Sequence, residues 1–581
     1  MRHASALDDC SHAIRVLHNV MPLAASHRSH WVPDRDAGPP LRDLTVGALL
    51  DEAARAWPEH EAVVYSAYDD MGVSARWSFG ELQERGLAAA RAFVASGIEP
   101  GERIAIWATN RPEWIQLQFG AAYAGIVLVP LNPLYRADEV RFVLGKSGAV
   151  ACFVEPENRG TSLWSIVDDV AGDLPDLRLR VAIGRAPDAV GPSLEEWLDG
   201  GHGATAEHEV ERRRAAVRAS DTSQIQFTSG TTGFPKGAEL HHGGLTDNAR
   251  LFADRAELHL GGRHCNPMPF FHCGGCIMAT LGCVATGSAH LPILTFDPAR
   301  MVRTIDAEEA TSAGAVPTML IGLEEEVDRS GGSLQSLDVI VTGGAPVPVD
   351  VERRWMRRFG VRFSITYGMT EASPVVTQSI PTDPERLQLA TCGPPLPHTE
   401  VDIVDVATRE RVPLGEQGEL RSRGYMVMKG YWDEPAATAE TIEEGGWLRS
   451  GDLARMEDGG YVTITGRAKE MIIRGGENIY PAEIEDALRR LEGVADASVV
   501  GVPDERYGEQ VAAFVRLEPG HTMTLEQMRA ALEGRVARFK IPRHLTVVDA
   551  LPLTPSGKVQ KFKLREAFLA ASPTAGTSSA V

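Results

Sequence analysis

The sequence predicts an α/β protein in which a large part built on parallel sheet precedes a small α+β part. The chain has 581 residues, too many for one hydrophobic core, so at least two domains are expected. Segments of strand and helix character alternate through most of the chain, as in parallel sheets covered by helices. After about residue 400 the pattern changes to short strands with frequent turns, and after 466–469 to a compact α+β pattern.

The first regular elements follow an irregular lead-in, residues 1–45, which has little periodicity. A helix is expected over 46–57. Ser78 and Glu81 have the spacing of a capping box, so they predict the start of a second helix, which ends before Gly97. A strand, a helix, a strand, a helix and a strand are then expected at 103–107, 110–124, 126–129, about 137–145 and 149–154. This order predicts a βαβ unit whose sheet is buried on both faces.

Two later strands run into glycine-bearing turns. The strand at 339–342 leads into Gly343-Gly344-Ala345-Pro346, and the strand at 362–366 leads into Tyr367-Gly368. In open parallel sheets, ligands collect at the carboxyl ends of the strands. We therefore expect both turns to face one crevice.

The C-terminal pattern is long enough for an independent small domain. It comprises a helix, two strands, a helix and a strand, at about 481–491, 496–502, 510–517, 524–537 and 544–548. Residues 571–581 are small and polar and are expected to be disordered.

Composition and charge are those of an ordinary globular protein, with 43% apolar residues, 24% charged residues and a net charge of −21. A negative chain disfavours general binding to nucleic acid or to anionic membranes. No apolar run approaches the roughly 18 residues that span a bilayer, and the N-terminus lacks the apolar stretch of a signal peptide. A cytoplasmic location is the default expectation.

The chain has seven cysteines, an odd number that fits reduced thiols better than a disulfide framework. Cys265, Cys273, Cys276 and Cys283 lie close together in sequence, beside His264 and His272. Such a group could hold zinc. Because no second C-x-x-C pair follows at finger-like spacing, buried free thiols are the favoured interpretation.

The run T-S-G-T-T-G-F-P-K-G at 228–237 is the strongest functional signal. Its glycines let backbone N–H groups approach a ligand closely, its hydroxyls add donors, and its lysine adds a positive charge. These features predict a polyphosphate loop that differs from Walker A, because Phe234 and Pro235 separate Gly233 from Lys236. The candidate ligand residues are Thr228, Ser229, Gly230, Thr231, Thr232, Gly233 and Lys236.

The turn Tyr367-Gly368-Met369-Thr370-Glu371 is the second signal. Tyr367 offers a flat face for a base, Gly368 permits close approach, and Glu371 is a hard oxygen ligand suited to Mg²⁺. Alone, the run could equally be an ordinary strand-to-helix turn.

Charged residues further along could complete a nucleotide site. Asp452, in S-G-D-L, could accept both hydroxyls of a ribose, although a plain Gly-Asp turn is the alternative. Arg467 is a fixed cation suited to ribose or phosphate oxygens, although it could simply solvate a linker. Lys558, on a turn after Gly557, could be an aimed charge. His272 follows Pro269-Phe270-Phe271. It could belong to the site or, equally, be a core histidine whose ring nitrogens are hydrogen-bonded.

In their order along the chain, these motifs resemble those of the adenylate-forming superfamily, which includes acyl-CoA synthetases. The resemblance covers about 45–565. It implies a large N-terminal domain (46–466) of stacked, parallel-rich αβα sheets with a small barrel-like subdomain, a hinge at 467–469, and a small mobile α+β C-terminal domain (470–570).

The resemblance also implies roles for individual residues. Tyr367 and Gly368 lie against adenine, with Gly344, Ala345 and Pro346 on its other face. Met369 belongs to the same turn, Thr370 meets the α-phosphate and Glu371 holds magnesium. Asp452 contacts ribose and Arg467 touches the nucleotide. Lys469 is the pivot, Gly475 and Gly476 line the pantetheine channel, and Lys558 is a mobile catalytic lysine. His272 borders the acid's carboxylate, and Lys558, Glu371, Thr228 and His272 form the catalytic set.

These roles predict an AMP-forming acid–CoA ligase that uses ATP, Mg²⁺ and coenzyme A. The acyl pocket is expected along 270–281 and 372–374, where glycine and alanine leave space and no lysine or arginine occurs. This composition suits an aliphatic chain, and the resemblance of the whole chain to medium- and long-chain fatty acyl-CoA synthetases implies a medium- or long-chain fatty acid. Aryl acids, a carrier-protein acceptor and a catalytically silent nucleotide-binding protein remain alternatives, and both a monomer and a homodimer are compatible with the sequence.

Overall fold

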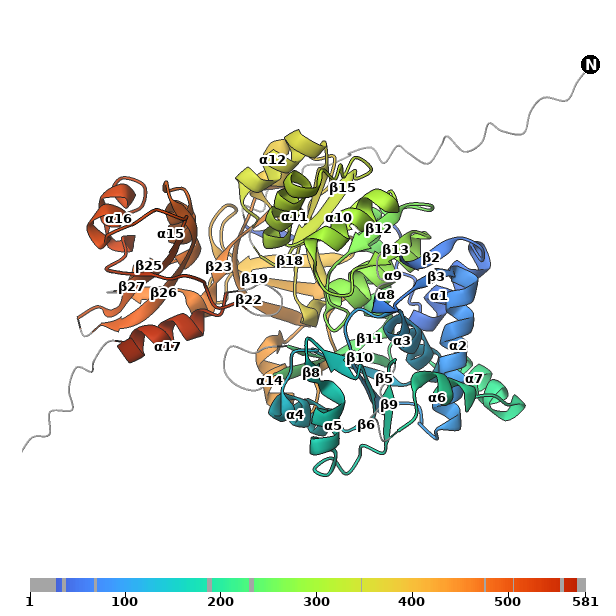
Figure 1. Cartoon of the computed structure of the whole chain (residues 1–581). Coiled ribbons are helices and arrows are strands. Elements are labelled where there is room, and N and C mark those ends of the chain that lie inside the picture. Colours follow the sequence, from blue (N-terminus) through green and yellow to red (C-terminus); the bar gives the residue numbers. More distant parts are fainter. Residues whose placement is uncertain are drawn as a thin grey trace, which may run out of the picture.

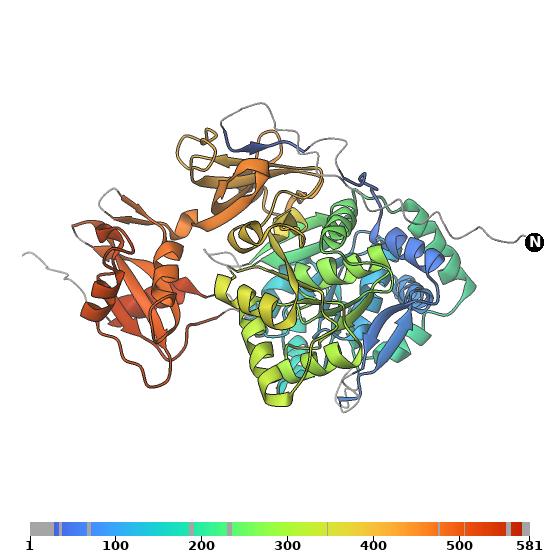
Figure 2. The same ribbon diagram turned by 90° about the horizontal axis from the view of Figure 1, so that it is seen from above.

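The computed structural model describes residues 28–33, 38–66, 71–184, 191–228, 235–345, 347–474, 477–504, 506–553 and 559–571, and the side chains of 477 and 478 are not described. Figures 1 and 2 show a large body with a smaller domain set apart at its C-terminal end. Among the described residues the body contains three large sheets and a two-stranded one, β7 (Glu157–Asn158) with β8 (Thr161–Ser162). Two of the large sheets are mostly parallel and flanked by helices, which confirms the predicted α/β class.

The first sheet contains the predicted βαβ unit. Its central strands β5 (Val127–Leu131), β4 (Arg103–Trp107) and β6 (Ala149–Val154) pair in parallel. Helix α3 (Pro112–Ala124) ends before Gly125, whose φ is +69°. The strand order is β20 (Gly430–Tyr431), β11 (Lys236–His241), β10 (Thr222–Thr228), β5, β4, β6 and β9 (Leu179–Ala182), and the connecting helices are α3 and α4 (Ala137–Ser147). The apolar runs of β5 and β6 are fully buried, as expected for parallel strands covered on both faces.

The second sheet brings the two predicted glycine-bearing turns together. Its strand order is β17 (Val375–Gln378), β16 (Arg362–Gly368), β15 (Val339–Gly343), β14 (Ser312–Gly314), β12 (Arg263–Asn266), β13 (Ala289–Pro292), β2 (Glu61–Tyr65) and β3 (Ala75–Ser78). Strands β15 and β16 pair in parallel, with Gly343 opposite Thr366. The turns that follow them therefore leave the same edge of the sheet, as predicted.

Helices between the two sheets form the main core. The helices α1 (Val46–Ala56), α2 (Phe79–Ala95), α3, α8 (His242–Arg255) and α9 (Thr280–Thr286) contribute to one continuous apolar cluster. The predicted capping box of α2 is present, since Glu81 N donates to Ser78 Oγ at 3.2 Å and Ser78 N donates to Glu81 Oε2 at 2.8 Å. A π-helical turn, η2 (Gly274–Ala279), precedes α9 and was not predicted.

The third sheet is antiparallel and corresponds to the short strands expected after residue 400. It contains β1 (His30–Trp31), β18 (Thr399–Val404), β19 (Gly418–Gly424), β22 (Trp447–Met456), β21 (Ile442–Glu443) and β23 (Val462–Arg467). Residues 1–45 were expected to be irregular, but β1 pairs with β18 and extends this sheet. That part of the prediction was wrong because the pairing depends on a strand nearly four hundred residues away.

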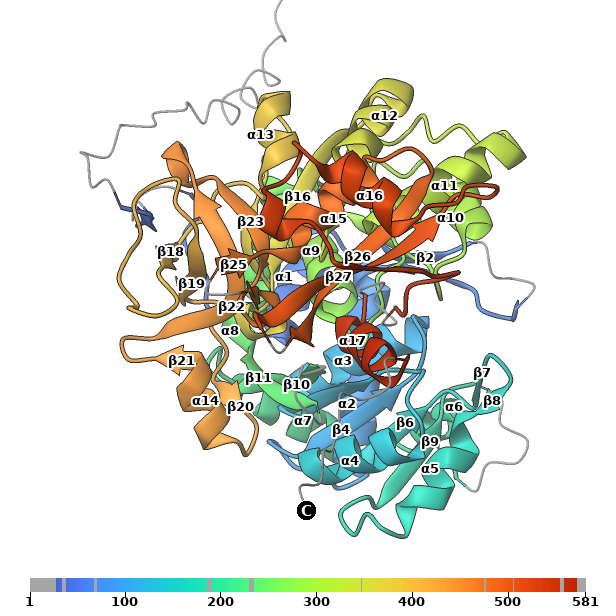
Figure 3. The ribbon, with the colours of Figure 1, turned by 90° about the vertical axis from the view of Figure 1, so that its left-hand side faces the viewer.

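The C-terminal domain has its own core. Its sheet consists of β25 (Glu477–Ile479), β24 (Ile472–Arg474), β27 (Gly508–Leu517), β26 (Val494–Asp504) and β28 (His544–Val547), and its helices are α15 (Pro481–Arg489), α16 (Leu525–Leu532) and α17 (Lys561–Ala571). Helix α16 is shorter than the predicted 524–537, because Glu533 is extended and Gly534 has φ +77°. Figure 3 looks toward this domain, with α15, α16 and α17 in front of the body.

No helix of the described residues is both long enough and apolar enough to cross a lipid bilayer.

Candidate functional site

The neck of the predicted phosphate loop is a β-hairpin. Strands β10 and β11 pair in antiparallel fashion with Thr228 opposite Lys236, and Thr228 Oγ1 donates to Lys236 O at 3.4 Å. The ammonium of Lys236 lies 5.1 Å from the ring centroid of Tyr431 on the adjoining strand β20. Two ends of the run at 228–237 are thus fixed by the sheet. Ser229, Gly230, Thr231, Thr232 and Gly233 lie outside the described residues.

Tyr431 connects this hairpin to the predicted metal ligand. Its hydroxyl donates to Glu371 Oε1 at 2.7 Å, and Met428 N donates to Glu371 O at 2.9 Å. Burial, followed by the charge of Glu371, raises the pKa of Tyr431, so the phenol stays protonated and remains a donor. Sequence reasoning missed Tyr431, because only the pairing of β20 with β11 brings it to the site.

The turn that carries Glu371 requires glycine. A Cβ on Gly368 would lie 1.9 Å from Pro374 O, and the neighbouring Met369 N donates to that carbonyl at 2.9 Å. Thr370 and Glu371 follow in the short 3₁₀ turn η3 (Thr370–Ala372), and both are buried. Close backbone approach, predicted from Gly368, is therefore used within the turn itself.

Tyr367, Asp452 and Arg467 converge from three strands. The Tyr367 hydroxyl donates to Asp452 Oδ2 at 2.8 Å, and Arg467 Nε lies 3.1 Å from Asp452 Oδ1. Asp452 and Arg467 are register partners in β22 and β23. Burial raises the pKa of Tyr367. Lys469, the predicted pivot, lies two residues past Arg467 in the exposed turn η5 (Ala468–Glu470), between β23 and β24.

The turn after β15 stands beside Tyr367. Gly343 is paired with Thr366, the residue before Tyr367, and a Cβ on Gly343 would lie 2.3 Å from Thr366 O. Gly344 is exposed with φ +75°, and Ala345 is half-buried. Gly344 and Ala345 therefore flank the tyrosine from the neighbouring strand, while Pro346 lies outside the described residues.

His272 is exposed, so the interpretation as a buried core histidine was wrong. Its Nδ1 accepts from Gly274 N at 3.3 Å at the start of the π-helical turn η2. Phe270 is fully buried instead, with its ring centroid 5.4 Å from that of Trp114.

The thiol after His272 points inward. Cys273 is fully buried, and its Sγ donates to Gln226 Oε1 at 2.8 Å. Burial raises the pKa of this thiol to about 12, with the Thr370 hydroxyl as a hydrogen-bonding neighbour. The four neighbouring cysteines, Cys265, Cys273, Cys276 and Cys283, are all buried and free, and no group of three or more His, Cys, Asp or Glu side chains among the described residues could hold a metal ion.

Three further predicted residues, Gly475, Gly476 and Lys558, also lie outside the described residues. Among the described ones, the predicted set forms two linked groups. Lys236, Tyr431 and Glu371 make one, and Tyr367, Asp452 and Arg467 make the other. The turn from Tyr367 to Glu371 joins the two groups.

The donor set around Glu371 fits Mg²⁺. The buried carboxylate of Glu371 and the adjacent Thr370 hydroxyl offer hard oxygen ligands close to the neck of the predicted phosphate loop. Magnesium is commonly bound in this way, through one or two carboxylates plus phosphate oxygens.

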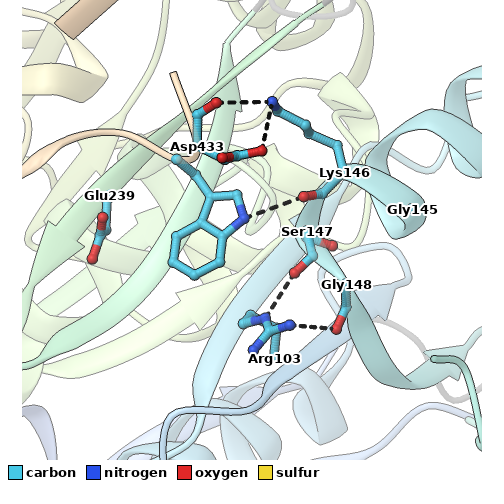
Figure 4. Close-up of a pocket in the computed structure, with 8 residues that line it drawn as sticks. Arg103, Gly145, Lys146, Ser147, Gly148, Glu239 and Asp433 are labelled. Atoms are coloured by element: carbon cyan, nitrogen blue, oxygen red, sulfur yellow. Dashed lines mark hydrogen bonds and ion pairs between the residues drawn. The ribbon is translucent and has the colours of Figure 1, made fainter. Parts of the chain in front are cut away.

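Figure 4 shows a different pocket, of about 430 Å³, on the α4 side of the first sheet. Arg103 donates to the carbonyls of Ser147 and Gly148, and Lys146 pairs with Asp433 at 3.5 Å. These contacts already engage its cations, and none of the predicted site residues lines it. It is therefore separate from the candidate site.

Comparison with known proteins shows what the chain is similar to. The family model of AMP-binding enzymes matches residues 50–432, and that of the AMP-binding enzyme C-terminal domain matches 483–558. YngI of Bacillus subtilis (strain 168), whose name gives it as a candidate acyl-CoA synthetase, is 39% identical, over 90% of this chain and 96% of its own.

The medium-chain acyl-CoA ligase ACSF2 of Mus musculus, a mitochondrial protein, is 35% identical, over 90% of this chain and 88% of its own. Among solved structures, ATP-bound MatB from Rhodopseudomonas palustris is 27% identical with a TM-score of 0.79, covering 90% of this chain and 99% of its own.

Proposed function

The chain belongs to the AMP-binding enzyme family, and from that premise we propose that it activates a carboxylic acid with ATP and transfers the acyl group to coenzyme A. Pyrophosphate and AMP are the other products. The observation that carries the proposal is the continuous path from Lys236 through Tyr431 and Glu371 to Tyr367 and Asp452. This path supports the proposal because it links residues suited to binding phosphate, a metal ion and ribose.

In the first half-reaction the acid needs no general base, because a carboxylic acid is already ionised near neutral pH. The obstacle is charge, since a carboxylate must approach the α-phosphate of a polyanion. Catalysis is therefore positioning together with electrostatic stabilisation. Lys236 and the loop at 228–233 would hold the phosphates, Thr370 would meet the α-phosphate, and Glu371 would hold Mg²⁺, which supplies further positive charge when bound.

Nucleotide positioning falls to the second group of residues. Asp452 would accept the ribose hydroxyls, with Arg467 balancing its charge at 3.1 Å. Tyr367, fixed through its hydroxyl, would present its ring to adenine opposite Gly344, Ala345 and Pro346. His272, exposed at the start of η2, would border the carboxylate of the acid. Lys558 would add a positive charge during adenylation.

In the second half-reaction, the thiol of coenzyme A attacks the adenylate carbonyl. A thiol of pKa near 8.5 needs only modest activation. Lys558 would obstruct this attack, so the C-terminal domain must swing about Lys469, and Gly475 and Gly476 would line the pantetheine channel. Two observations support Lys469 as the pivot: it is exposed, and it lies in the short connection between β23 and β24.

The substrate we propose is a medium-chain fatty acid, in keeping with the 35% identity to a medium-chain acyl-CoA ligase. Aryl acids, and a carrier-protein acceptor in place of coenzyme A, are the alternatives. A role in fatty acid metabolism follows from this substrate. The buried free cysteines agree with a reducing compartment, and we propose the cytoplasm.

The decisive experiment measures the exchange of labelled pyrophosphate into ATP with a panel of C4–C18 and aryl acids. We expect exchange that depends on both the acid and magnesium, followed by acyl-CoA formation when coenzyme A is added. The absence of exchange with every acid would refute the proposal and favour a silent nucleotide-binding protein.

A further inference from the structure

A buried cluster of amides and thiols lies where the acyl chain was expected to meet an apolar wall. It comprises Gln224 and Gln226 on β10, Cys273 and Cys276 on either side of the start of η2, and Gln118 on α3. Gln118, Gln224 and Gln226 are 2%, 1% and 3% exposed, and both thiols are fully buried. Buried amides normally have partners for their polar atoms, so this cluster calls for a complete inventory of its hydrogen bonds.

The hydrogen bonds form a chain leading inward from Cys273. Cys273 Sγ donates to Gln226 Oε1 at 2.8 Å, and Gln226 Nε2 donates to Gln224 Oε1 at 2.9 Å and to Cys276 Sγ at 3.2 Å. On the other side, Gln118 Nε2 donates to Cys276 O at 2.9 Å. Cys276 Sγ donates to Gln224 Oε1 at 3.6 Å, so Gln118 and Gln224 both bond Cys276.

Each of these two glutamines keeps one polar atom without a partner. Gln224 Nε2 and Gln118 Oε1 are buried and make no hydrogen bond within the described part of the chain. One is a donor and the other an acceptor, and they belong to different elements, β10 and α3. Leaving a buried polar group unpaired costs about 1–3 kcal/mol, so two such atoms around one residue indicate an absent partner.

The outer end of the chain touches the candidate site. Cys273 follows His272 and lies against the Thr370 hydroxyl, next to Glu371. Gln224 is four residues before Thr228 on the same strand, which corresponds to about 13 Å at roughly 3.3 Å per residue. A chain whose carboxylate lies near Thr228 and His272, and which runs alongside β10 and η2, would reach Gln224 part-way along its length.

We propose that Gln118 and Gln224 recognise a hydroxyl group in the middle of the acyl chain, so that the substrate is a medium-chain hydroxy acid. This inference rests on the proposed acid–CoA ligase function. A hydroxyl both accepts and donates, so it satisfies Gln224 Nε2 and Gln118 Oε1 together. An oxo group could satisfy only the donor, and a plain alkyl chain would leave both atoms unpaired.

The chemical consequence is discrimination against the unsubstituted acid. Sites built to hydrogen-bond a substrate hydroxyl strongly reject the analogue that lacks it, because their own polar groups are then left unpaired. Because a plain acid would leave one or two buried polar atoms unpaired, we expect roughly a 10- to 100-fold preference in kcat/KM for the correctly placed hydroxyl.

The test compares octanoate and decanoate with their hydroxylated forms, scanning the hydroxyl position along the chain, by pyrophosphate exchange and by acyl-CoA formation. A preference confined to one or two adjacent positions is expected. Equal or better turnover of the plain acids would overturn this inference while leaving the ligase function intact. If no acid supports exchange, the ligase proposal and this inference fall together.

Two variants assign the preference to the named atoms. Gln224→Leu and Gln118→Leu should each lower the hydroxy-to-plain ratio of kcat/KM roughly tenfold and keep or improve turnover of the plain acid. Gln116→Leu is the matched control, because Gln116 is on the same helix, 4% exposed, and bonded through Nε2 to Arg85 O. It should leave the ratio unchanged.

A ratio that is unaffected by Gln224→Leu in the folded protein would overturn the assignment. Should the leucine variant not fold, Gln224→Met and Gln118→Met keep the side-chain length and give the same readout. An unchanged ratio in both methionine variants would likewise refute the inference.

Discussion

The hydroxyl of Tyr431 lies 2.7 Å from Glu371 Oε1 and donates its proton to that carboxylate. The ring of the same tyrosine faces the ammonium of Lys236, with 5.1 Å between the nitrogen and the ring centroid. One side chain on β20 therefore contacts both the candidate metal ligand and the lysine of the predicted phosphate loop. Neither contact involves residues close in sequence.

Removing the hydroxyl should impair adenylation without unfolding the protein. Tyr431→Phe leaves a buried carboxylate without its donor, which costs about 1–3 kcal/mol, and it allows Glu371 to turn. We expect roughly a tenfold loss of kcat for pyrophosphate exchange and a higher magnesium requirement. Tyr461→Phe is the control, because the Tyr461 hydroxyl donates to Asp383 Oδ1, with 2.9 Å between the two atoms, and neither residue belongs to the candidate site. Equal effects of the two variants would contradict a specific role for Tyr431.

Asp452 should control affinity for ATP rather than for the acid. Asp452→Asn weakens its charge-assisted bond to Arg467 and its acceptance from Tyr367. We expect the KM for ATP to rise roughly 10- to 100-fold, with a small change in the KM for the acid. Arg467→Leu should have a weaker effect, because Arg467 is 46% exposed. Steady-state kinetics with each substrate varied in turn would measure the difference, and an unchanged KM for ATP would contradict the ribose role.

Single substitutions should impair one half-reaction and leave the other intact. Lys558→Ala should abolish adenylate formation but spare thioester formation from supplied acyl-adenylate, because only the first step needs its charge. Lys469→Pro should form adenylate and then stall, because proline restricts the backbone of the proposed pivot. Single-turnover measurements of both steps would test this. Equal loss of both steps in Lys558→Ala, or normal turnover in Lys469→Pro, would contradict the assignments.

Stability should fall in mild acid because two buried histidines are held neutral. Burial lowers the pKa of both His242 and His264 to about 4, and the Nδ1 of His242 accepts from Val46 N at 3.2 Å. The unfolded chain takes up protons below its pKa of about 6.5, whereas the folded chain does so only near 4. Each histidine should therefore lower the unfolding free energy by up to about 3 kcal/mol between these pH values.

Chemical denaturation at several pH values would measure this slope. His264→Gln should reduce the decline between pH 6.5 and pH 4.5, whatever its effect on stability at pH 7.5. A slope equal to that of the unsubstituted protein would contradict the role of this histidine.

Glu352 should have the opposite effect on stability, which it should lower as the pH rises. It lies in the first turn of α12 (Val349–Phe359), is 1% exposed and has no partner for Oε2 among the described residues. Burial raises its pKa to about 8. Since the unfolded carboxyl ionises near 4.5, the folded state loses stability as pH rises from about 4.5 to 8.

Glu352→Gln should therefore raise the melting temperature at pH 9 by several degrees and have little effect at pH 5. Asp350→Asn, an exposed acid in the same turn, is the control and should change neither value. A melting temperature that falls at pH 9 in Glu352→Gln would contradict the prediction.

Local sequence signals predicted most helices and strands. The features that were not predicted depend on contacts between residues far apart in sequence. The capping box at Ser78 and the glycine after α3 set helix ends through bonds within one turn, so the sequence was sufficient there. Tyr431 could not be predicted, because its position depends on β20 joining β11 across nearly two hundred residues. The buried glutamines Gln118, Gln224 and Gln226 were missed for the same reason. They lie on α3 and β10, far in sequence from the segment at 270–281, and only the fold brings them to Cys273 and Cys276.

Strand β1 has a practical consequence for anyone who shortens this protein. Trp31 packs on Gly460, where an added Cβ would lie 2.4 Å from the indole, and His30 bonds Glu400 at 2.7 Å. A truncated protein that begins at α1 would lack β1, so β18 would become an exposed edge strand. Its unpaired backbone groups could then pair with another copy of the protein. Affinity tags and trimmed expression boundaries are therefore best placed ahead of residue 28.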